Sequence, residues 1–365
     1  MVPTQQSKQN VLVVLGSGRW GGGEKNCVDL ISGLRNYYNF VLIHISGKSI
    51  NHVLKHKEIK HYEFPLNETP TPKKIFDFIK LVKSFKPDLI HSHLNRANLY
   101  LSLAKPCLKC TWISTVHGFT SQIYNIFPNH LICVSKAIQN DLPKRFRRKS
   151  TLIYNGIKQI NLDTNHSISR QNQSDSNKNI KAIVLATIHP NKGQQFVCEA
   201  LKHYESKVAI EFIGTGSQEN TMKLLELSKK LPNVQFKNNI VSNIQTLLHE
   251  TDFVIIPSFK EALSYVAIES LSLGVPILAS RTGGLPEVAK EGFHGHFFTP
   301  GDIVSFQQGL EDMVSDHEVL RQNLKMQPFL ENNKQFTEKH MTEKIHQLYK
   351  KLILNGPRKL TEAME

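Results

Sequence analysis

Two carboxylates, Glu261 and Glu269, lie eight positions apart, soon after an apolar run that ends at Pro257. If a helix begins near Ser264, its first amide groups have no partners inside the helix, and they point back toward Glu261. Such a helix start binds anions and suits a diphosphate. Glu261 is then placed to bind sugar hydroxyls, and Glu269, about one turn inside the helix, to reach a ribose. Taken alone, the same spacing also fits a surface loop and an exposed helical glutamate.

Short turns, most of them containing glycine, follow the apolar runs of the second half. Glycine lets the backbone approach a ligand closely, and parallel strands bring such turns to one edge of a sheet. Each turn alone is equally an ordinary chain reversal. The residues of these turns, with the pair that closes the first half, are Asn155, Gly156, Lys192, Gly193, Gly214, Gly216, Gly283, Gly284, Pro300 and Gly301.

Residues 16–21, Gly-Ser-Gly-Arg-Trp-Gly, match the glycine fingerprint of dinucleotide-binding proteins. A nicotinamide enzyme also needs an acidic residue at the end of the second strand, where it binds the ribose hydroxyls. The second predicted strand, residues 40–46, is followed by Gly47 and Lys48 and carries no acid there. The sequence therefore argues against hydride transfer.

The cysteine and histidine pairs do not complete a metal site. Cys107 and Cys110 have the spacing of a metal or redox pair, but no second pair accompanies them and structural zinc takes four ligands. His91 and His93 share one face of a predicted strand without a third partner, so we expect them to be structural or to line a site. No acidic cluster follows a strand. We therefore expect neither a metal nor another cofactor.

Apolar runs that alternate with amphipathic segments predict two α/β units, each with a parallel sheet covered on both faces. The predicted strands are residues 11–15, 40–46, 89–90, 112–116, 131–134, 183–186, 208–213, 253–257 and 276–279. The predicted helices are residues 22–34, 75–85, 195–203, 221–230, 267–274 and 336–354.

A polar stretch over residues 158–180 separates the two units and reads as a linker. We expect an N-terminal Rossmann-like, acceptor-binding domain over residues 1–157 and a C-terminal Rossmann-like, nucleotide-sugar-binding domain over residues 181–335. A helix within residues 336–365 should pack back on the first domain. Two such facing domains would hold the active site in the cleft between them.

All the excess positive charge lies in the first part of the chain. The protein has 365 residues and a net charge of +14, and residues 1–150 hold 22 basic and 8 acidic side chains. Such an imbalance attracts an anionic membrane, an acidic acceptor or nucleic acid. The densest cluster, residues 144–149, fits either such a contact or a solvated basic loop. A lysine-rich amphipathic helix within residues 73–86 fits either a lipid contact or packing on its own sheet.

No nucleic acid is expected as a partner, because the sequence has no recognisable binding motif or aromatic stacking platform. No apolar run approaches the roughly 20 residues that span a bilayer, and residues 1–10 lack the apolar core of a secretion signal. We therefore expect a cytoplasmic enzyme, peripheral on the cytoplasmic face of the inner membrane.

From residue 11 to residue 302 the sequence resembles the retaining GT-B glycosyltransferases of the group 1 type. The ordered motifs from Lys192 to Asp302 carry most of the resemblance, and residues 21–24, 87–93 and 115–117 match more loosely. The resemblance implies transfer of a hexose or N-acetylhexosamine from a nucleoside-diphosphate sugar to a lipid-linked or lipopolysaccharide-type glycan acceptor. It also implies that the anomeric configuration is retained and that no metal takes part.

The resemblance assigns a role to each matching position. Glu261 would hold the sugar hydroxyls, His117 would lie beside the reacting sugar carbon, and Lys192 would neutralise the diphosphate. Glu269 would bind the ribose. The other donor-binding positions are Gly22 and Gly23 in a loop that touches the donor, the amides of Leu263, Ser264 and Tyr265 at the phosphates, Ile240 facing the base, and Asn155, Thr187, Gly214 and Gly216.

One position departs from the family pattern. The family usually has an arginine five positions before the phosphate lysine, and this chain has Thr187 there. Arg19 or His189 is a candidate to replace the lost charge. Three alternatives stay open: a sugar-nucleotide epimerase of the same fold, a nucleic-acid-binding relative, and a catalytically inactive relative.

Overall fold

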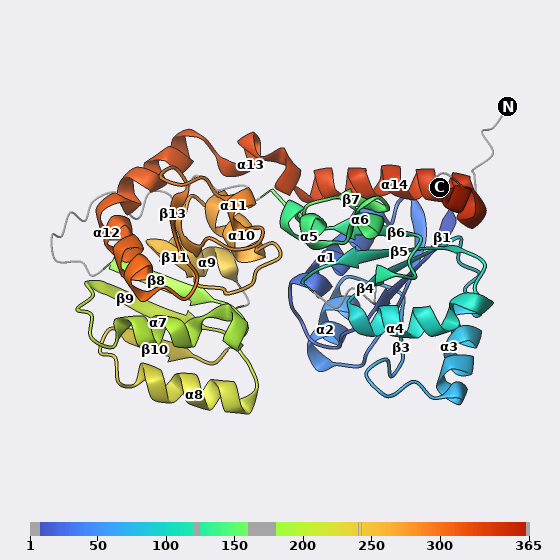
Figure 1. Cartoon of the computed structure of the whole chain (residues 1–365), viewed down its shortest axis with the longest axis horizontal. Helices are drawn as coiled ribbons and strands as arrows, with labels where there is room; N and C mark the ends of the chain where they lie inside the picture. Colours follow the sequence, from blue (N-terminus) through green and yellow to red (C-terminus); the bar gives the residue numbers. More distant parts are fainter. Residues whose placement is uncertain (1–7, 120–124, 160–179, 240, 242, 363–365) are drawn as a thin grey trace. The chain divides into compact units, whose positions relative to one another are not determined.

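The computed structural model describes residues 8–119, 125–159, 180–239, 241 and 243–362. The chain forms two compact units, the first made of Met1–Gly156 with Gln335–Glu365 and the second of Ile157–Lys334. Each unit is built on one parallel sheet with helices around it (Figure 1). The predicted α/β class, with two Rossmann-like domains, is confirmed.

The first sheet has the strand order β3-β2-β1-β4-β5-β6-β7, and every pair of neighbours is parallel. The chain runs outward from β1 to β3 and then returns to place β4 on the other side of β1. The loops that follow β1 and β4 therefore diverge at the carboxyl edge, which is where such sheets bind ligands. The strands are β1 (Gln9–Leu15), β2 (Tyr38–His44), β3 (His61–Glu63), β4 (Leu89–His93), β5 (Thr111–Val116), β6 (His130–Cys133) and β7 (Ser150–Leu152).

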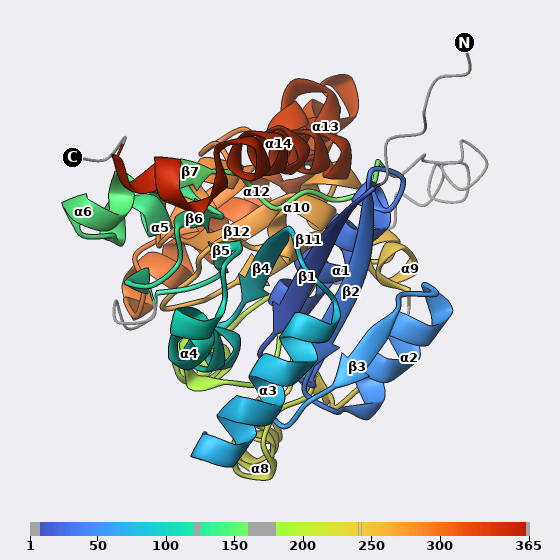
Figure 2. The same ribbon diagram turned by 90° about the vertical axis from the view of Figure 1, so that its right-hand side faces the viewer.

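Alternate residues of β1 point to two different helix layers. Val11 and Val13 belong to the core with α1 (Gly22–Leu34), α2 (Lys48–His56) and α14 (Glu338–Glu362). Leu12 and Val14 belong to the core with α3 (Pro72–Ser84) and α4 (Asn95–Ala104). Figure 2 shows α3 and α4 on one side of β1. Because both faces are covered, β1 reads as a continuous apolar run.

The last helix, α14, belongs to the first unit. Its buried side chains Met341, Ile345, Tyr349 and Leu352 lie in the same core as α1, so the predicted return of the chain is confirmed. This helix therefore seals one face of the sheet that carries the histidines described below.

The second sheet has the order β10-β9-β8-β11-β12-β13, again parallel throughout. β8 lies between β9 and β11, so the loops after β8 and β11 diverge at the switch point of this unit. The strands are β8 (Ile180–Leu185), β9 (Val208–Ile213), β10 (Val234–Lys237), β11 (Phe253–Ile256), β12 (Ile277–Ser280) and β13 (Gly295–Phe298). The helices are α7 (Gln194–Leu201), α8 (Gln218–Ser228), α9 (Ile244–His249), α10 (Tyr265–Ser272), α11 (Leu285–Val288), α12 (Ile303–Met326) and α13 (Phe329–Asn332).

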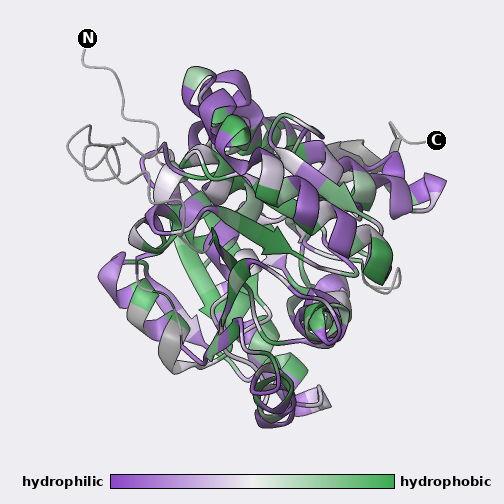
Figure 3. Cartoon of the chain, turned by 90° about the vertical axis from the view of Figure 1, so that its left-hand side faces the viewer, coloured by the Kyte–Doolittle hydropathy of each residue, from purple (hydrophilic) through white to green (hydrophobic). Residues whose placement is uncertain are grey.

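Apolar residues concentrate on the strands, and the outer helix surfaces are mostly polar (Figure 3). The long helix α12 was absent from the sequence prediction, although Phe306, Leu310, Met313, Leu320 and Leu324 are buried along it at helical spacing. α8 begins three residues earlier than predicted, because the side chain of Ser217 accepts a hydrogen bond from the amide of Asn220.

The basic cluster of residues 144–149 is partly helical. Lys144–Arg147 forms the short helix α6, which follows α5 (Lys136–Asp141), and the side chain of Phe146 in α6 is buried. Residues 160–179 of the predicted linker, and Ile240, lie outside the described residues. Within the part of the chain that the structure describes, no helix is both long and apolar enough to cross a membrane.

Candidate functional site

An ion pair lies at the switch point of the second sheet. The Nζ atom of Lys192 is 2.7 Å from Oε2 of Glu261, and the hydroxyl of Ser258 donates to the same oxygen over 3.0 Å. Glu261 is buried, whereas Lys192 is partly exposed. The two residues follow β8 and β11, so strand order brings together side chains that lie 69 positions apart.

The turn that carries Lys192 is held by its own side chains and backbone. His189 Nδ1 accepts a hydrogen bond from the amide of Asn191, which caps the short 3₁₀ turn Pro190–Lys192. Gly193 ends that turn in the left-handed region at φ +73°, and an added Cβ would lie 1.9 Å from the carbonyl oxygen of Pro257. A larger residue at this position would therefore push the β8 and β11 loops apart.

Helix α10 begins at Tyr265, two residues before the predicted range of 267–274 and next to Ser264, the start that the site prediction assumed. Ser264 is its N-cap, and its hydroxyl accepts a hydrogen bond from the amide of Ala267. Leu263 and Tyr265 are buried beside it, and Glu269 lies in the second turn, half-buried. The start of the helix thus lies three residues after Glu261, the partner of Lys192.

Gly214 and Gly216 follow β9, and their missing side chains make room for backbone. A Cβ added at Gly214 would lie 1.9 Å from the carbonyl oxygen of Ala186, and one added at Gly216 would lie 2.4 Å from the carbonyl oxygen of Ile188. Close packing between two loops requires both glycines. Their assignment to donor binding stays a prediction.

His117 follows β5 directly, at the carboxyl edge of the first sheet. An added Cβ at Gly23, in the first turn of α1, would lie 3.7 Å from two carbons of the His117 ring and 3.3 Å from Leu94. The first unit thus brings His117 and Gly23 together. Their roles at the donor stay a prediction. Gly22 is the first residue of α1.

A cavity of about 290 Å³ opens beside His117. Leu94, after β4, holds a positive φ of 71° without being glycine, a strained backbone that is typical of functional sites. The cavity is lined by Gly16, Leu94, Asn95, Arg96, Asn98, Thr115, Val116, His117, Gly118 and Asn125.

A buried row of histidines supports His117. His93 Nδ1 is 2.8 Å from His117 Nε2, and the rings of His91 and His93 lie 4.3 Å apart. His91 contacts the hydroxyl of Tyr349 over 2.6 Å through Nδ1 and that of Thr115 over 2.7 Å through Nε2. The prediction that the two strand histidines are structural or line a site is consistent with this row.

Burial keeps these imidazoles neutral, because it disfavours their charged form. Burial lowers the pKa of His117 to about 4. It also lowers the pKa of His91 to about 3, and the charge of nearby His117 adds to that shift. It also holds the pKa of His93 well below the usual value. At neutral pH the row therefore consists of hydrogen-bonding groups without charge.

Three further residues named in the sequence analysis, Asn155, Thr187 and Arg19, lie outside the ion pair and the histidine row. Asn155 is buried, and its side-chain oxygen accepts a hydrogen bond from Asn26 of α1 over 2.9 Å. Thr187 is exposed, and its carbonyl accepts a hydrogen bond from Gln194. Arg19 is also exposed, in the first unit.

The glycine fingerprint after β1 packs against the chain itself. An added Cβ at Gly18 would lie 2.4 Å from the carbonyl oxygen of Ser46, and one at Gly47 would lie 1.7 Å from that of Gly18. The loop that follows β2 therefore occupies the space beside the fingerprint. This packing gives the glycines a role that needs no dinucleotide.

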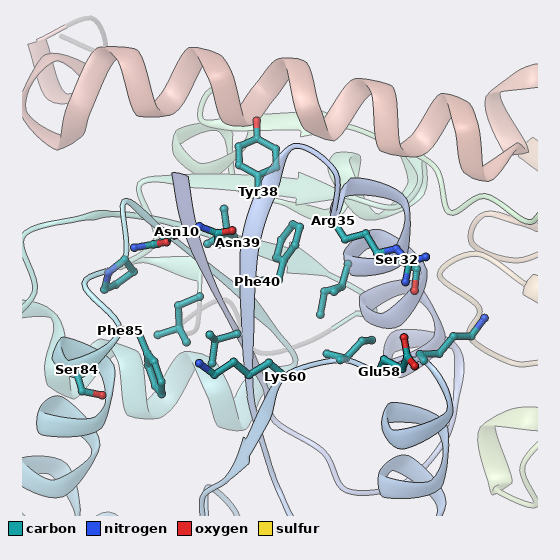
Figure 4. A pocket seen from close by; sticks show the side chains of 17 residues that line it. Asn10, Ser32, Arg35, Tyr38, Asn39, Phe40, Glu58, Lys60, Ser84 and Phe85 are labelled. Atoms are coloured by element: carbon teal, nitrogen blue, oxygen red, sulfur yellow. Dashed lines mark hydrogen bonds between the residues drawn. The ribbon is translucent and has the colours of Figure 1, made fainter. Parts of the chain in front are cut away.

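A larger cavity, of about 580 Å³, lies in the first unit near the starts of β1 and β2, away from the carboxyl edge. Figure 4 shows Arg35 and Glu58 on one side of it and Phe85 on the other. None of the predicted site residues line it, so its size does not make it the candidate site.

Within the described ranges, no three histidine, cysteine, aspartate or glutamate side chains are grouped so as to hold a metal ion. Cys107 and Cys110 are both free thiols. The expectation of a metal-independent enzyme stays a prediction.

Comparisons with known proteins identify the family. Residues 165–328 match the family model of glycosyl transferases group 1, and residues 20–159 match that of glycosyltransferase family 4. A glycosyltransferase of Methanocaldococcus jannaschii, MJ1178, is 25% identical over 345 residues, which is 87% of each chain. The chain therefore belongs to the group 1 glycosyltransferases.

One further relative and one solved structure extend the comparison. The Escherichia coli UDP-Gal:alpha-D-GlcNAc-diphosphoundecaprenol alpha-1,3-galactosyltransferase is 23% identical over 286 residues, 67% of this chain and 70% of that enzyme. The crystal structure of Anabaena HepE with UDP and glucose superposes with a TM-score of 0.79 at 19% identity, covering 94% of this chain and 99% of that one. The fold is accordingly of the GT-B type.

Sequence reasoning missed several supporting residues. It did not find the hydroxyl of Ser258 on Glu261, the Asn26–Asn155 contact, or the pairing of His93 with His117. The two-residue spacing of His91 and His93 was a usable signal, because such residues share one face of a strand.

Proposed function

We propose that this protein transfers a hexose or N-acetylhexosamine from a nucleoside-diphosphate sugar to a lipid-linked or lipopolysaccharide-type glycan, with retention of configuration. The observation that carries the proposal is the Lys192–Glu261 pair, 2.7 Å apart and next to the start of α10. The pair supplies a cation for a diphosphate and a carboxylate for sugar hydroxyls at one place.

The pair rearranges when the donor binds. Lys192 and the first amides of α10 turn to the diphosphate, and Glu261 then accepts hydrogen bonds from the sugar hydroxyls. Breaking the sugar–phosphate bond leaves negative charge on the diphosphate and positive charge on the sugar, and fixed donors at the phosphate favour that transition state. The acceptor hydroxyl attacks the sugar carbon from the face that the diphosphate leaves, and its proton passes to the leaving phosphate oxygen.

Relatives support the substrate classes. The E. coli relative is named for UDP-galactose as donor and a diphosphoundecaprenol-linked sugar as acceptor, and HepE is described with UDP and with UDP-glucose. We therefore place UDP-sugars first among donors and polyprenyl-diphosphate-linked sugars first among acceptors. The second unit binds the donor, and the first unit binds the acceptor.

Nucleotide binding tests the donor site. Thermal unfolding is followed with UDP, GDP, ADP and CMP, and one nucleotide at about 100 times its Kd should add about 2.7 kcal/mol to the free energy of unfolding. Glu269→Ala should lose this stabilisation, whereas Glu250→Ala, an exposed carboxylate of the same unit, should keep it. If no nucleotide stabilises the wild-type protein, the donor site assignment is wrong.

Donor turnover separates the enzyme classes that share this fold. Release of nucleoside diphosphate that rises with a polyprenyl-diphosphate sugar indicates transfer. Conversion of the sugar nucleotide without acceptor indicates an epimerase instead. Since we propose that no metal takes part, the transfer rate should be unchanged by a chelator.

We also propose that the first unit docks on an anionic membrane through the turn Ile126–Pro128, together with α6. Ile126 and Phe127 are 44% and 40% exposed. Lys149 Nζ donates to the carbonyls of Ile126 and Pro128, and Lys105 Nζ donates to that of Phe127. Two cations thus brace a turn that presents apolar side chains to solvent, the arrangement of a surface that inserts into a lipid headgroup layer.

The charges around this turn are uncompensated. Burial, with the charges of nearby Lys105 and Arg145, lowers the pKa of Lys149 to about 8. Among the described residues, Lys105, Arg145 and Lys149 form no ion pair with a carboxylate. Anionic headgroups would relieve this repulsion, so binding should weaken as salt concentration rises.

Vesicle flotation tests the membrane proposal. The protein should float with phosphatidylcholine vesicles that contain phosphatidylglycerol and stay behind with phosphatidylcholine alone. The double variant Ile126→Ser, Phe127→Ser should lose binding, whereas Phe76→Ser, at an aromatic residue that is 67% exposed on α3, should keep it. Equal flotation of both variants, or competition by duplex DNA with no lipid preference, contradicts the proposal.

A further inference from the structure

His93 and His117 present one ring nitrogen each to the other, 2.8 Å apart. Burial keeps both rings neutral, and a neutral imidazole carries one N–H and one lone pair. One ring must therefore donate and the other accept. Either Nδ1 of His93 holds the shared proton, or Nε2 of His117 does.

The far nitrogen of His93 decides between the two arrangements. Its Nε2 is buried and has no hydrogen-bond partner among the described residues. If His117 were the donor, the proton of His93 would lie on this Nε2, as a buried N–H without an acceptor. If His93 is the donor, the same atom is a bare lone pair, and orphaned acceptors are tolerated better than orphaned donors.

We propose that His93 is a positioning residue, which donates through Nδ1 to Nε2 of His117 and fixes His117 in the tautomer that carries its proton on Nδ1. This proposal rests on the proposed function for one point, that His117 contacts the transferred sugar. His117 Nδ1 forms no hydrogen bond to a described residue, so its N–H is left to donate to an oxygen of the ligand.

The rest of the row holds His93 in place. Its ring packs against that of His91 at an angle of 35°, and His91 contacts the hydroxyls of Tyr349 and Thr115 through its two nitrogens. Tyr349 belongs to α14, so the returning C-terminal helix fixes the row from the side opposite His117. The tautomer of His117 therefore depends, through this row, on the position of α14.

Nitrogen NMR of the imidazoles reads the tautomer directly. Ring nitrogens that carry a proton are shifted far from those that do not, and the signals of His117 are assigned by their loss in His117→Gln. In the wild-type protein at pH 7, His117 should be protonated on Nδ1 and bare at Nε2. A proton on Nε2 of His117 overturns the proposal.

Two variants of His93 separate positioning from packing. In His93→Asn, the side-chain amide occupies the place of Nδ1 and still donates, so His117 should keep its tautomer. In His93→Leu, the side chain fills a similar space without a donor, so His117 should shift toward the Nε2–H tautomer. An unchanged spectrum of His117 in folded His93→Leu also overturns the proposal.

Activity supplies the functional readout. With a UDP-sugar that stabilises the wild-type protein, His93→Leu should lower kcat about tenfold, the worth of one hydrogen bond, while nucleotide binding is unchanged. His93→Asn should restore most of the rate. If the tautomer behaves as stated but no donor is ever turned over, the proposed function fails and the positioning role stands.

Discussion

The two units place different chemistry at the same structural position. Each sheet has a switch point at its carboxyl edge, between β1 and β4 in the first unit and between β8 and β11 in the second. In the second unit this edge carries a buried glutamate, a lysine and a helix start. In the first unit, His117 and its supporting row of neutral, hydrogen-bonded histidines lie there.

Under the proposed function, the difference matches the two ends of the sugar–phosphate bond that is broken. A diphosphate leaving group gains negative charge, so charged and amide donors are useful beside it. A sugar gains positive charge, and a protonated histidine beside it would oppose the reaction. The first unit avoids that conflict because burial keeps His117 uncharged at neutral pH.

Removing the carboxylate of the second unit should have the largest effect. Glu261→Ala deletes the proposed anchor for the sugar hydroxyls and leaves Lys192 without its partner. We expect transfer to fall by a factor on the order of 10³, with the thermal midpoint little changed. Initial rates and unfolding curves of Glu261→Ala and of the control Glu250→Ala check this, and retained transfer in a folded Glu261→Ala would remove Glu261 from the site.

Removing the histidine of the first unit should affect rate without affecting nucleotide binding. His117→Ala should lower kcat by a factor on the order of 10², the cost of one aligned donor, while stabilisation by the nucleotide stays at the wild-type level. Because the pKa of His117 is about 4, the wild-type rate should show no titration of this residue between pH 6 and 8. Loss of nucleotide binding in His117→Ala would break the proposed division of labour.

Acid should destabilise the first unit more than the second. In the first unit, burial lowers the pKa of His117 and of His130 from the usual 6.5 to about 4, and that of His91 to about 3. In the described part of the second unit, burial lowers the pKa of His294 to about 4. Below pH 6.5 the unfolded chain takes up protons that the folded unit refuses. The free energy of unfolding is therefore largest above pH 6.5 and falls as the pH drops toward 4.

Hydrogen exchange, corrected for intrinsic rates, measures this separately for each unit. Between pH 7 and pH 5, peptides from β4 and β5 should lose more protection than peptides from β11 and β12. The double variant His91→Leu, Tyr349→Phe removes one titrating group and its partner together, so it should reduce the acid sensitivity. Equal losses in both units would show that the buried histidines do not set the acid stability.

Restoring the arginine of the family pattern should have the smallest effect. Thr187 is exposed, and the structure uses its backbone carbonyl rather than its side chain. Thr187→Arg should therefore change the free energy of unfolding by less than about 0.5 kcal/mol. It should tighten nucleoside-diphosphate binding by a few-fold at low salt, measured by titration calorimetry against Thr187→Gln, and an equal gain in Thr187→Gln would argue against a charge effect.

Local sequence signals were sufficient for most of the framework. Apolar runs and glycine turns predicted strands of both sheets, and α10 begins next to Ser264, as the site prediction assumed. α12 was missed because its buried residues are widely separated along a mostly polar helix. Its spacing nonetheless follows the 3.6-residue period, so the signal was present.

The sequence by itself determined the α/β class, the family and the identity of Glu261, Lys192 and His117 as candidates, because these rest on residue type and local order. The tertiary structure decided which of them meet and what state they are in. His93 reaches His117 across 24 positions, and Lys192 reaches Glu261 across 69, through strand order alone. The histidines are neutral because they are buried, and the glycines are required because neighbouring backbone packs against them. Both depend on the packing of segments that are distant in sequence.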